Sequence, residues 1–111
     1  MTFHYSLEEQ ITEGTVQIIR DFRVIFDRIA ITFENIATEQ TKILHFSRVI
    51  GLSIEALCGV DYENDMDIMA YRTLIGLTVD KLEKLYVYEM IIDDYIVHIK
   101  CLNPASLDNA A

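Results

Sequence analysis

Apolar residues recur every three or four positions along the first third of the chain. The series consists of Leu7, Ile11, Ile18, Phe22, Ile25, Ile29, Phe33 and Ile36. These steps match the 3.6-residue period of an α-helix, so one face of such a helix is apolar for many turns. Ser6 and Glu9 have the spacing of a capping box, which marks a helix start. The pattern therefore predicts a long first helix that begins at Ser6 and ends near residues 38–41.

Two further apolar stretches predict the rest of a helical core. One runs from about residue 41 to 58 and stops at Gly59, a residue type that commonly ends helices. It is either a separate helix or the continuation of the first one as a bent rod. After a loop at residues 60–64, a third helix begins, and Gly76 either kinks it or divides it in two. The last helix ends near residue 102, because the residue before Pro104 disfavours helical geometry.

These elements predict an all-α protein. We expect a small antiparallel bundle of three helices, or of four if Gly76 divides the third. A length of 111 residues suits one domain, so residues 1–111 are expected to form a single helical domain with a frayed tail from about residue 103. The chain contains one proline and four glycines. Such sparse turn residues are typical of long helices and not of many short strands.

The last predicted helix is apolar on two sides. Its second, narrower arc consists of Val79, Tyr86, Met90 and Val97. A helix with two apolar faces needs two packing partners, supplied either by a central place in the bundle or by another subunit. Because two-fold dimers are the commonest soluble oligomers, we expect a homodimer or higher oligomer formed through Tyr86, Met90 and Val97. The alternative is a monomer that leaves this strip exposed.

The charge of the chain restricts its partners. Eighteen acidic residues against nine basic ones give a net charge of −9, which repels phosphate backbones, so nucleic-acid binding is not expected. The nine basic residues are scattered along the sequence and indicate no basic patch. The most hydrophobic stretch, residues 43–60, is interrupted by charged residues, so no membrane span is expected either.

The cysteines and the N-terminus bear on location. Cys58 and Cys101 lie in apolar stretches and belong to no CxxC pair, which predicts buried, reduced thiols. The first residues lack the basic and apolar regions of a signal peptide. We therefore expect a cytoplasmic protein.

Carboxylates of the last predicted helix are weak candidates for a metal site. Glu89 and Asp93 are four residues apart, as are Asp94 and His98, a spacing that places two ligands on one side of a helix. The simpler interpretation is solvated or salt-bridged side chains, with His98 paired to Asp94 near the helix end.

The acidic residues between Asp61 and Asp67 alternate as they do in a calcium loop. Met66 and Arg72 stand where an EF-hand needs glycine and glutamate, so that match fails. No metal or other cofactor is therefore expected.

No catalytic motif stands out, and the sequence contains no glycine-rich phosphate loop. We expect a non-enzymatic protein-binding or regulatory module, of the inhibitor, immunity-protein or chaperone type in size and charge. In this hypothesis Asp61, Tyr62 and Glu63 contact a partner protein with a basic surface.

Two alternatives remain. One is a small-ligand pocket between helices, lined by tyrosines and by Arg20, Arg23 or Arg72. The other is a metal-dependent enzyme that uses Glu89, Asp93, Asp94 and His98.

Overall fold

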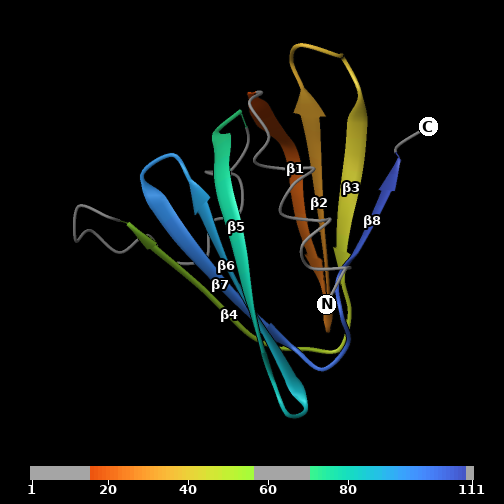
Figure 1. The fold of residues 1–111 in the computed structure, drawn as a ribbon, viewed down its shortest axis with the longest axis vertical. Helices are drawn as coiled ribbons and strands as arrows, with labels where there is room; N and C mark the ends of the chain where they lie inside the picture. The colour runs from red at the N-terminus through yellow and green to blue at the C-terminus, as the bar shows by residue number, and fades with distance from the viewer. Residues whose placement is uncertain (1–15, 57–70, 110–111) are drawn as a thin grey trace.

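The computed structural model describes residues 16–56 and 71–109, and within these ranges the chain is all β-structure (Figure 1). The strands are β1 (Gln17–Ile25), β2 (Arg28–Asn35), β3 (Thr41–Phe46), β4 (Val49–Ala56), β5 (Thr73–Leu82), β6 (Leu85–Ile92), β7 (Tyr95–Cys101) and β8 (Ser106–Asn109). They form one sheet in the order β4-β7-β6-β5-β1-β2-β3-β8, and neighbouring strands are antiparallel. The predicted all-α bundle is therefore wrong.

The burial pattern has the two-residue period of strands. In β7, Tyr95, Val97, Ile99 and Cys101 are buried, while the residues between them are not. In β2, Ile29, Ile31 and Phe33 alternate in the same way. Isoleucine is the most frequent residue of the chain, and β-branched side chains pack well on a pleated surface. A step of four residues, as between Ile29 and Phe33 in β2, is also two periods of a strand. In β1 the register shift between Ile19 and Asp21 further disturbs the two-residue alternation. The spacing therefore resembles that of a helix although it lies within strands.

Three hairpins turn without glycine. Ile25 pairs with Arg28, Leu82 with Leu85 and Ile92 with Tyr95, which leaves two residues in each turn. The turn sequences are Phe26–Asp27, Glu83–Lys84 and Asp93–Asp94. Phe26 and Asp93 adopt positive φ angles of 53° and 48°, a conformation that Asn-Gly or Gly-Gly pairs usually provide. Without those signals, the helical prediction extended through the turns.

Two other expected features are also corrected. Gly76 does not kink a helix; it lies in β5, where the register with β6 shifts between Leu74 and Gly76. Glycine in a strand commonly accompanies such a bulge. The expected frayed tail contains β8, which pairs with β3 from His45 to Lys42.

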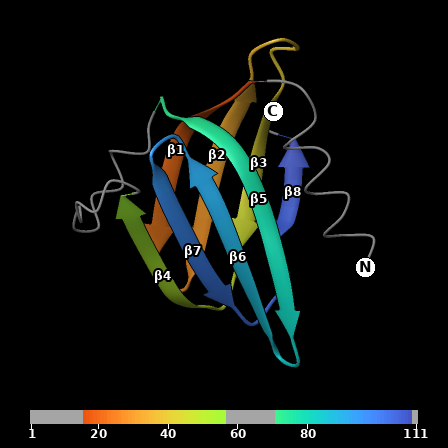
Figure 2. The same ribbon diagram turned by 60° about the vertical axis from the view of Figure 1, so that its left-hand side comes forward.

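The sheet bends into two layers that face each other across the core. Figure 1 shows β4, β7, β6 and β5 on one side of a V and β1, β2, β3 and β8 on the other. The layers share a short seam in which β1 and β5 pair through Gln17–Leu74 and Ile18–Thr73. Ile19 extends it by backbone hydrogen bonds to Arg72 and Tyr71, just before β5. At the other end they are joined by the links β3–β4 and β7–β8. Figure 2 shows the two edge strands, β4 and β8, on opposite sides of the fold.

Tyr88 on β6 connects the layers at the centre of the core. Its side chain is fully buried, and its ring packs edge-on against Phe46 of β3, with centroids 5.0 Å apart. The backbone N–H of Ala105, one residue before β8, donates a 2.8 Å hydrogen bond to the Tyr88 hydroxyl. The buried hydroxyl is thus satisfied by the opposite layer. Burial raises the pKa of Tyr88 to about 12.

Cys101, at the end of β7, confirms the predicted buried thiol. Its Sγ donates to the Asn103 carbonyl oxygen at 3.1 Å, and burial raises the pKa of the thiol to about 11. A thiol with a raised pKa remains protonated and weakly nucleophilic at neutral pH. Cys58 lies outside the described residues.

The hydroxyl of Tyr88 is a direct target for mutation. Tyr88→Phe removes the acceptor of the Ala105 N–H, so the free energy of unfolding should fall by about 1–2 kcal/mol. Urea denaturation measures this loss. Tyr71→Phe is the control, because Tyr71 is largely exposed, and its effect should stay within about 0.5 kcal/mol.

The same variant should also change how the free energy of unfolding depends on pH. Since the pKa of Tyr88 is raised in the folded state, its contribution to stability is present below pH 10 and is lost as the pH rises toward 12. Tyr88→Phe should lack this part of the alkaline loss. If the free energies of unfolding of the wild type and Tyr88→Phe fall in parallel between pH 9 and 12, this account of the tyrosine is wrong.

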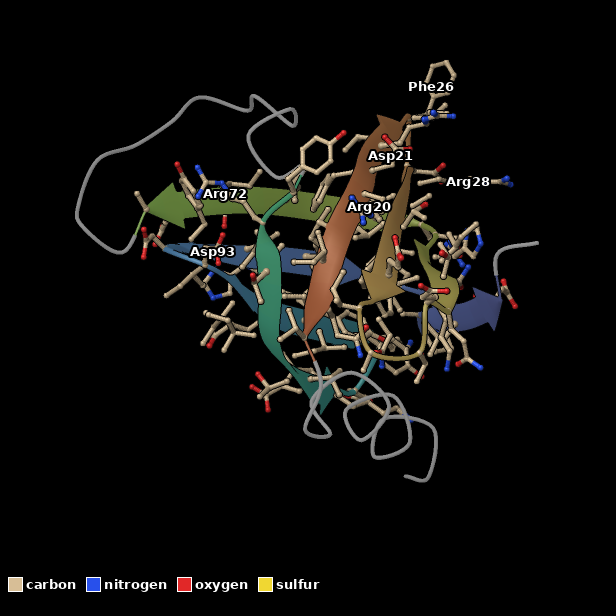
Figure 3. All side chains as sticks on the ribbon, turned by 90° about the horizontal axis from the view of Figure 1, so that it is seen from above. Arg20, Asp21, Phe26, Arg28, Arg72 and Asp93 are labelled. Atoms are coloured by element: carbon tan, nitrogen blue, oxygen red, sulfur yellow. The ribbon has the colours of Figure 1, made fainter. Side chains whose placement is uncertain are left out.

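Phe26 at the β1–β2 turn has both a left-handed backbone and a 99% exposed side chain; Figure 3 shows the ring projecting from the hairpin tip. Phe26→Gly should raise the free energy of unfolding by about 0.5–1 kcal/mol, because glycine tolerates positive φ. Phe26→Ala keeps the backbone strain and should give no such gain. Equal gains for both variants in urea denaturation would show that φ is not the cause.

Candidate functional site

The residues expected to bind a second subunit belong to the core of one chain. Met90 and Val97 are opposite each other in the β6–β7 register, and both are completely buried. Tyr86 is half-buried and packs against the core. Because alternate residues of a strand share one face, Tyr86, Tyr88 and Met90 all point between the layers. The helical homo-oligomer inferred from a second apolar arc is therefore wrong.

The other expected contacts to a partner lie in an acidic stretch of the sequence. Asp61, Tyr62 and Glu63 lie outside the described residues.

The weak metal candidates fall into separate places. Glu89 and His98 are cross-strand neighbours on the outer face, with Oε2 and Nε2 2.9 Å apart. Asp93, in the β6–β7 turn, pairs instead with Arg72 at 3.8 Å, as Figure 3 illustrates. Asp94 is exposed in the same turn. In a strand, residues four positions apart are separated by roughly 13 Å, whereas in a helix they lie one turn apart. The four-residue spacing therefore does not bring these side chains together.

Metal-ligating side chains also fail to gather elsewhere in residues 16–56 and 71–109. No group of three or more His, Cys, Asp or Glu side chains in these ranges is placed to hold a metal ion. The same part of the chain contains no helix suited to crossing a membrane.

The arginines considered for a ligand pocket are engaged with carboxylates. Arg20 pairs with Glu34 at 2.8 Å, and its guanidinium also lies 5.7 Å from the Tyr71 ring centroid. Arg23 pairs with Asp21 at 3.3 Å. Arg72 pairs with Asp93 and lies 4.6 Å from the centroid of the Tyr95 ring. The charges of these arginines are thus largely compensated within the chain.

A different set of basic residues surrounds a shallow, open pocket of about 380 Å³. We call it the basic pocket, and its lining consists of Arg48, Lys81, Glu83, Lys84, Tyr86 and Leu102. The lining comes from the β3–β4 link, the β5–β6 hairpin and the residue after β7. These segments meet at the lower end of the fold in Figure 1.

The basic pocket has a local excess of positive charge. Three cations face one carboxylate, Glu83, and none of the three forms an ion pair in the described part of the chain. This contrasts with a whole-chain charge of −9. Seven of the 18 acidic residues, and no lysine or arginine, fall in residues 1–15 and 57–70, so the described residues contain 11 acidic and nine basic side chains. The strands are therefore far closer to neutrality than the composition indicates.

Two hydrogen bonds hold the rim of the pocket together. The Leu102 N–H donates to the Arg48 carbonyl at 3.0 Å, and the Asn103 side-chain Nδ2 donates to Ser47 Oγ at 2.9 Å. Arg48 itself has a positive φ of 53°, which is uncommon for a long side chain. The two interlayer links thus fix each other and determine where Arg48 sits.

The pocket also has an aromatic wall that continues into the core. Lys81 Nζ lies 5.7 Å from the centroid of the Tyr86 ring, within the range of a cation–π contact. Tyr86 stacks on Tyr88 with centroids 6.4 Å apart and planes inclined by 19°. The wall is thus supported by the residue that joins the two layers.

Sequence reasoning missed this pocket. Lys81 and Lys84 are close in sequence, and a recognised hairpin turn at Glu83–Lys84 would have brought them together. Arg48 precedes them by more than thirty residues, and it joins them only through the pairing of the two interlayer links. The expectation of no basic patch therefore does not hold for the folded chain.

The hydrogen bond between the two links is expected to stabilise the fold. Asn103→Ala and Ser47→Ala should each lower the free energy of unfolding by about 1 kcal/mol. In the double variant the losses should not add, and a coupling energy of about 0.5–1 kcal/mol is expected from a double-mutant cycle in urea. Strict additivity would mean that the two side chains do not interact in solution.

Comparisons with known proteins inform the fold. No family model and no curated protein sequence matches the chain. Among solved structures, it is similar to an uncharacterized protein from Neisseria gonorrhoeae, with a TM-score of 0.59 and 15% sequence identity. The match covers 84% of this chain and 89% of that one. At this identity the likeness supports the β-fold and carries no information about function.

Proposed function

We propose that the protein binds a small organic anion in the basic pocket. Arg48, Lys81 and Lys84 would contact a phosphate or carboxylate group, and Tyr86 and Leu102 would contact an apolar or planar part of the ligand. The observation that carries this proposal is the convergence of three cations, without ion-pair partners among the described residues, on one concave surface.

The lining chemistry selects the ligand class. A guanidinium offers paired N–H donors that match the oxygens of phosphate or carboxylate, while the lysines add point charges. Tyr86 presents a ring to a planar group. Glu83 disfavours a second anionic group placed beside it and can accept a hydrogen bond from a ligand donor. A volume of about 380 Å³ lies at the lower end of the range of small-molecule sites, which suits a ligand with one ring.

The pocket is exposed, and this limits the strength of each contact. Water and salt screen charges at the surface, so each cation should contribute on the order of 0.5–1 kcal/mol. Three such contacts with an aromatic contact correspond to modest, salt-sensitive affinity.

We also propose that this site binds and does not catalyse. Its lining side chains are basic, aromatic or aliphatic apart from Glu83. It contains no nucleophile next to a histidine, the arrangement used in nucleophilic catalysis.

The test uses three probes and the full chain. Phenyl phosphate combines a ring with an anion, whereas inorganic phosphate lacks the ring and phenol lacks the charge. NMR titration of the isotope-labelled protein should show the tightest binding for phenyl phosphate, with shifts at Tyr86 and Leu102. The double variant Lys81→Ala/Lys84→Ala should weaken this binding about tenfold, as expected for the loss of roughly 1.4 kcal/mol.

Lys100→Ala is the matched control, because Lys100 is an exposed lysine of β7 that does not line the pocket. Its effect should be below twofold. Equal affinity for phenol and phenyl phosphate, or an unchanged affinity in the double variant, would refute the anion site.

A further inference from the structure

The β4 edge of the sheet is long and, in the described part of the chain, paired on one side only. β4 has eight residues and pairs with β7, whereas β8 at the other edge has four residues and follows Pro104. An edge strand presents backbone N–H and C=O groups that another strand can bind. Natural proteins often protect long edges with proline, lysine or an inward-pointing charge. β4 contains no proline, lysine or inward-pointing charge, and its single charged residue, Glu55, is exposed. Only its start is irregular, because the register with β7 shifts between Val49 and Gly51 and the Val49 N–H donates to the Asp27 carbonyl at 2.9 Å. Residues 51–56 therefore form the regular, open part of this edge.

A groove of about 250 Å³ accompanies this edge. Its lining is Ile50, Gly51, Leu52, Ser53, His98 and Lys100. Ile50 is 62% exposed and contributes apolar surface to the groove. The groove thus offers apolar surface next to free backbone groups, and it shares no lining residue with the basic pocket.

Gly51 gives the groove a specific feature. It pairs with Lys100 across the β4–β7 register. A Cβ placed on Gly51 would lie 3.6 Å from both Cβ and Cδ of Lys100 and 3.8 Å from its Cγ. The aliphatic stem of Lys100 therefore lies over Gly51, where a larger side chain would otherwise stand, and brings its ammonium within reach of the outer edge of β4.

Lys100 is also the uncompensated charge of the groove. His98 is paired with Glu89 at 2.9 Å, while Lys100 forms no ion pair within residues 16–56 and 71–109. A strand added beside β4 would place one residue opposite Gly51, on the same face as Lys100. A carboxylate at that position would meet the ammonium, and a basic residue would be repelled.

We propose that β4 accepts an extended acidic peptide segment of a partner protein as an additional strand at this edge of the sheet. The backbone of the segment pairs with the free edge of β4, and an aspartate or glutamate opposite Gly51 forms an ion pair with Lys100. Main-chain hydrogen bonds provide the affinity in such strand addition, and side-chain contacts provide the specificity. The charge of Lys100 therefore determines which segments bind.

The experiment titrates the labelled full chain with synthetic peptides. The first is an end-capped eight-residue peptide of alternating valine and threonine with a central glutamate, and the second has lysine in place of the glutamate. NMR shifts should centre on β4 and β7, and the glutamate peptide should bind at least fivefold more tightly. Two further peptides carry N-methyl groups on alternate backbone amides, one at the odd positions and the other at the even positions. Because an added strand pairs with β4 through one of its edges, one of these two peptides should not bind.

Protein variants separate the ion pair from the backbone pairing. Lys100→Ala should reduce the preference for glutamate over lysine to less than twofold while residual binding remains. Lys84→Ala, an exposed lysine of the basic pocket, should leave the preference unchanged.

Three results would overturn the proposal. They are an absence of binding by the glutamate peptide at millimolar concentration, equal affinity for the glutamate and lysine peptides, and unchanged preference in Lys100→Ala. Sedimentation of the protein with and without peptide adds a fourth. A dimer that the peptide fails to dissociate would assign the β4 edge to a second copy of the chain instead.

Discussion

The contact between Tyr88 and the opposite layer is the constraint on which this fold depends. Direct strand pairing between the layers is limited to two residue pairs at the β1–β5 seam. A few further backbone hydrogen bonds, from Ile19 to Tyr71 and Arg72 and from Val49 to Asp27, add to it. Side chains packed between the layers supply the rest of their contact. Tyr88 combines apolar packing against Phe46 with a hydrogen bond to the backbone before β8. A purely apolar side chain could supply the packing against Phe46, but only a side chain that also carries a hydroxyl can accept the hydrogen bond from the Ala105 N–H. Together with the hydrogen bonds between the two links, it holds the β7–β8 link in place.

The same constraint shapes both candidate sites. The interlayer links carry Arg48 and Leu102 to the basic pocket, and their mutual hydrogen bonds fix its rim. Where the β3–β4 link ends, β4 begins and forms the open edge of its layer. The pocket offers positive charge with an aromatic wall, whereas the edge offers backbone groups with one lysine. In both, basic side chains attract negative charge in a chain whose overall charge is strongly negative.

The sequence allowed the buried positions to be predicted better than the elements that bury them. Phe22, Ile29 and Phe33 were expected on an apolar face and are buried, because both a helix and a pair of strands hide apolar residues at regular intervals. Ile25 and Ile36 were expected on the same face and are exposed. The choice between a helical and a strand period depended on recognising turns such as Phe26–Asp27, whose residues are not typical of a hairpin. Pocket residues distant in sequence, such as Arg48 and Lys84, depend on strand order, which local patterns do not encode.

The order in which the strands appear along the chain has a consequence for synthesis. Residues 49–101 contain the whole of the β4-β7-β6-β5 layer as one continuous segment, inserted between β3 and β8 of the other layer. During translation, the β3 edge with Ile43 and Leu44 therefore waits for its neighbour until an entire second layer has left the ribosome. Until then it is open to pairing with the wrong strand. The four residues of β8 thus cover the β3 edge only late in translation, and the nascent chain is most prone to mispairing just before β8 leaves the ribosome.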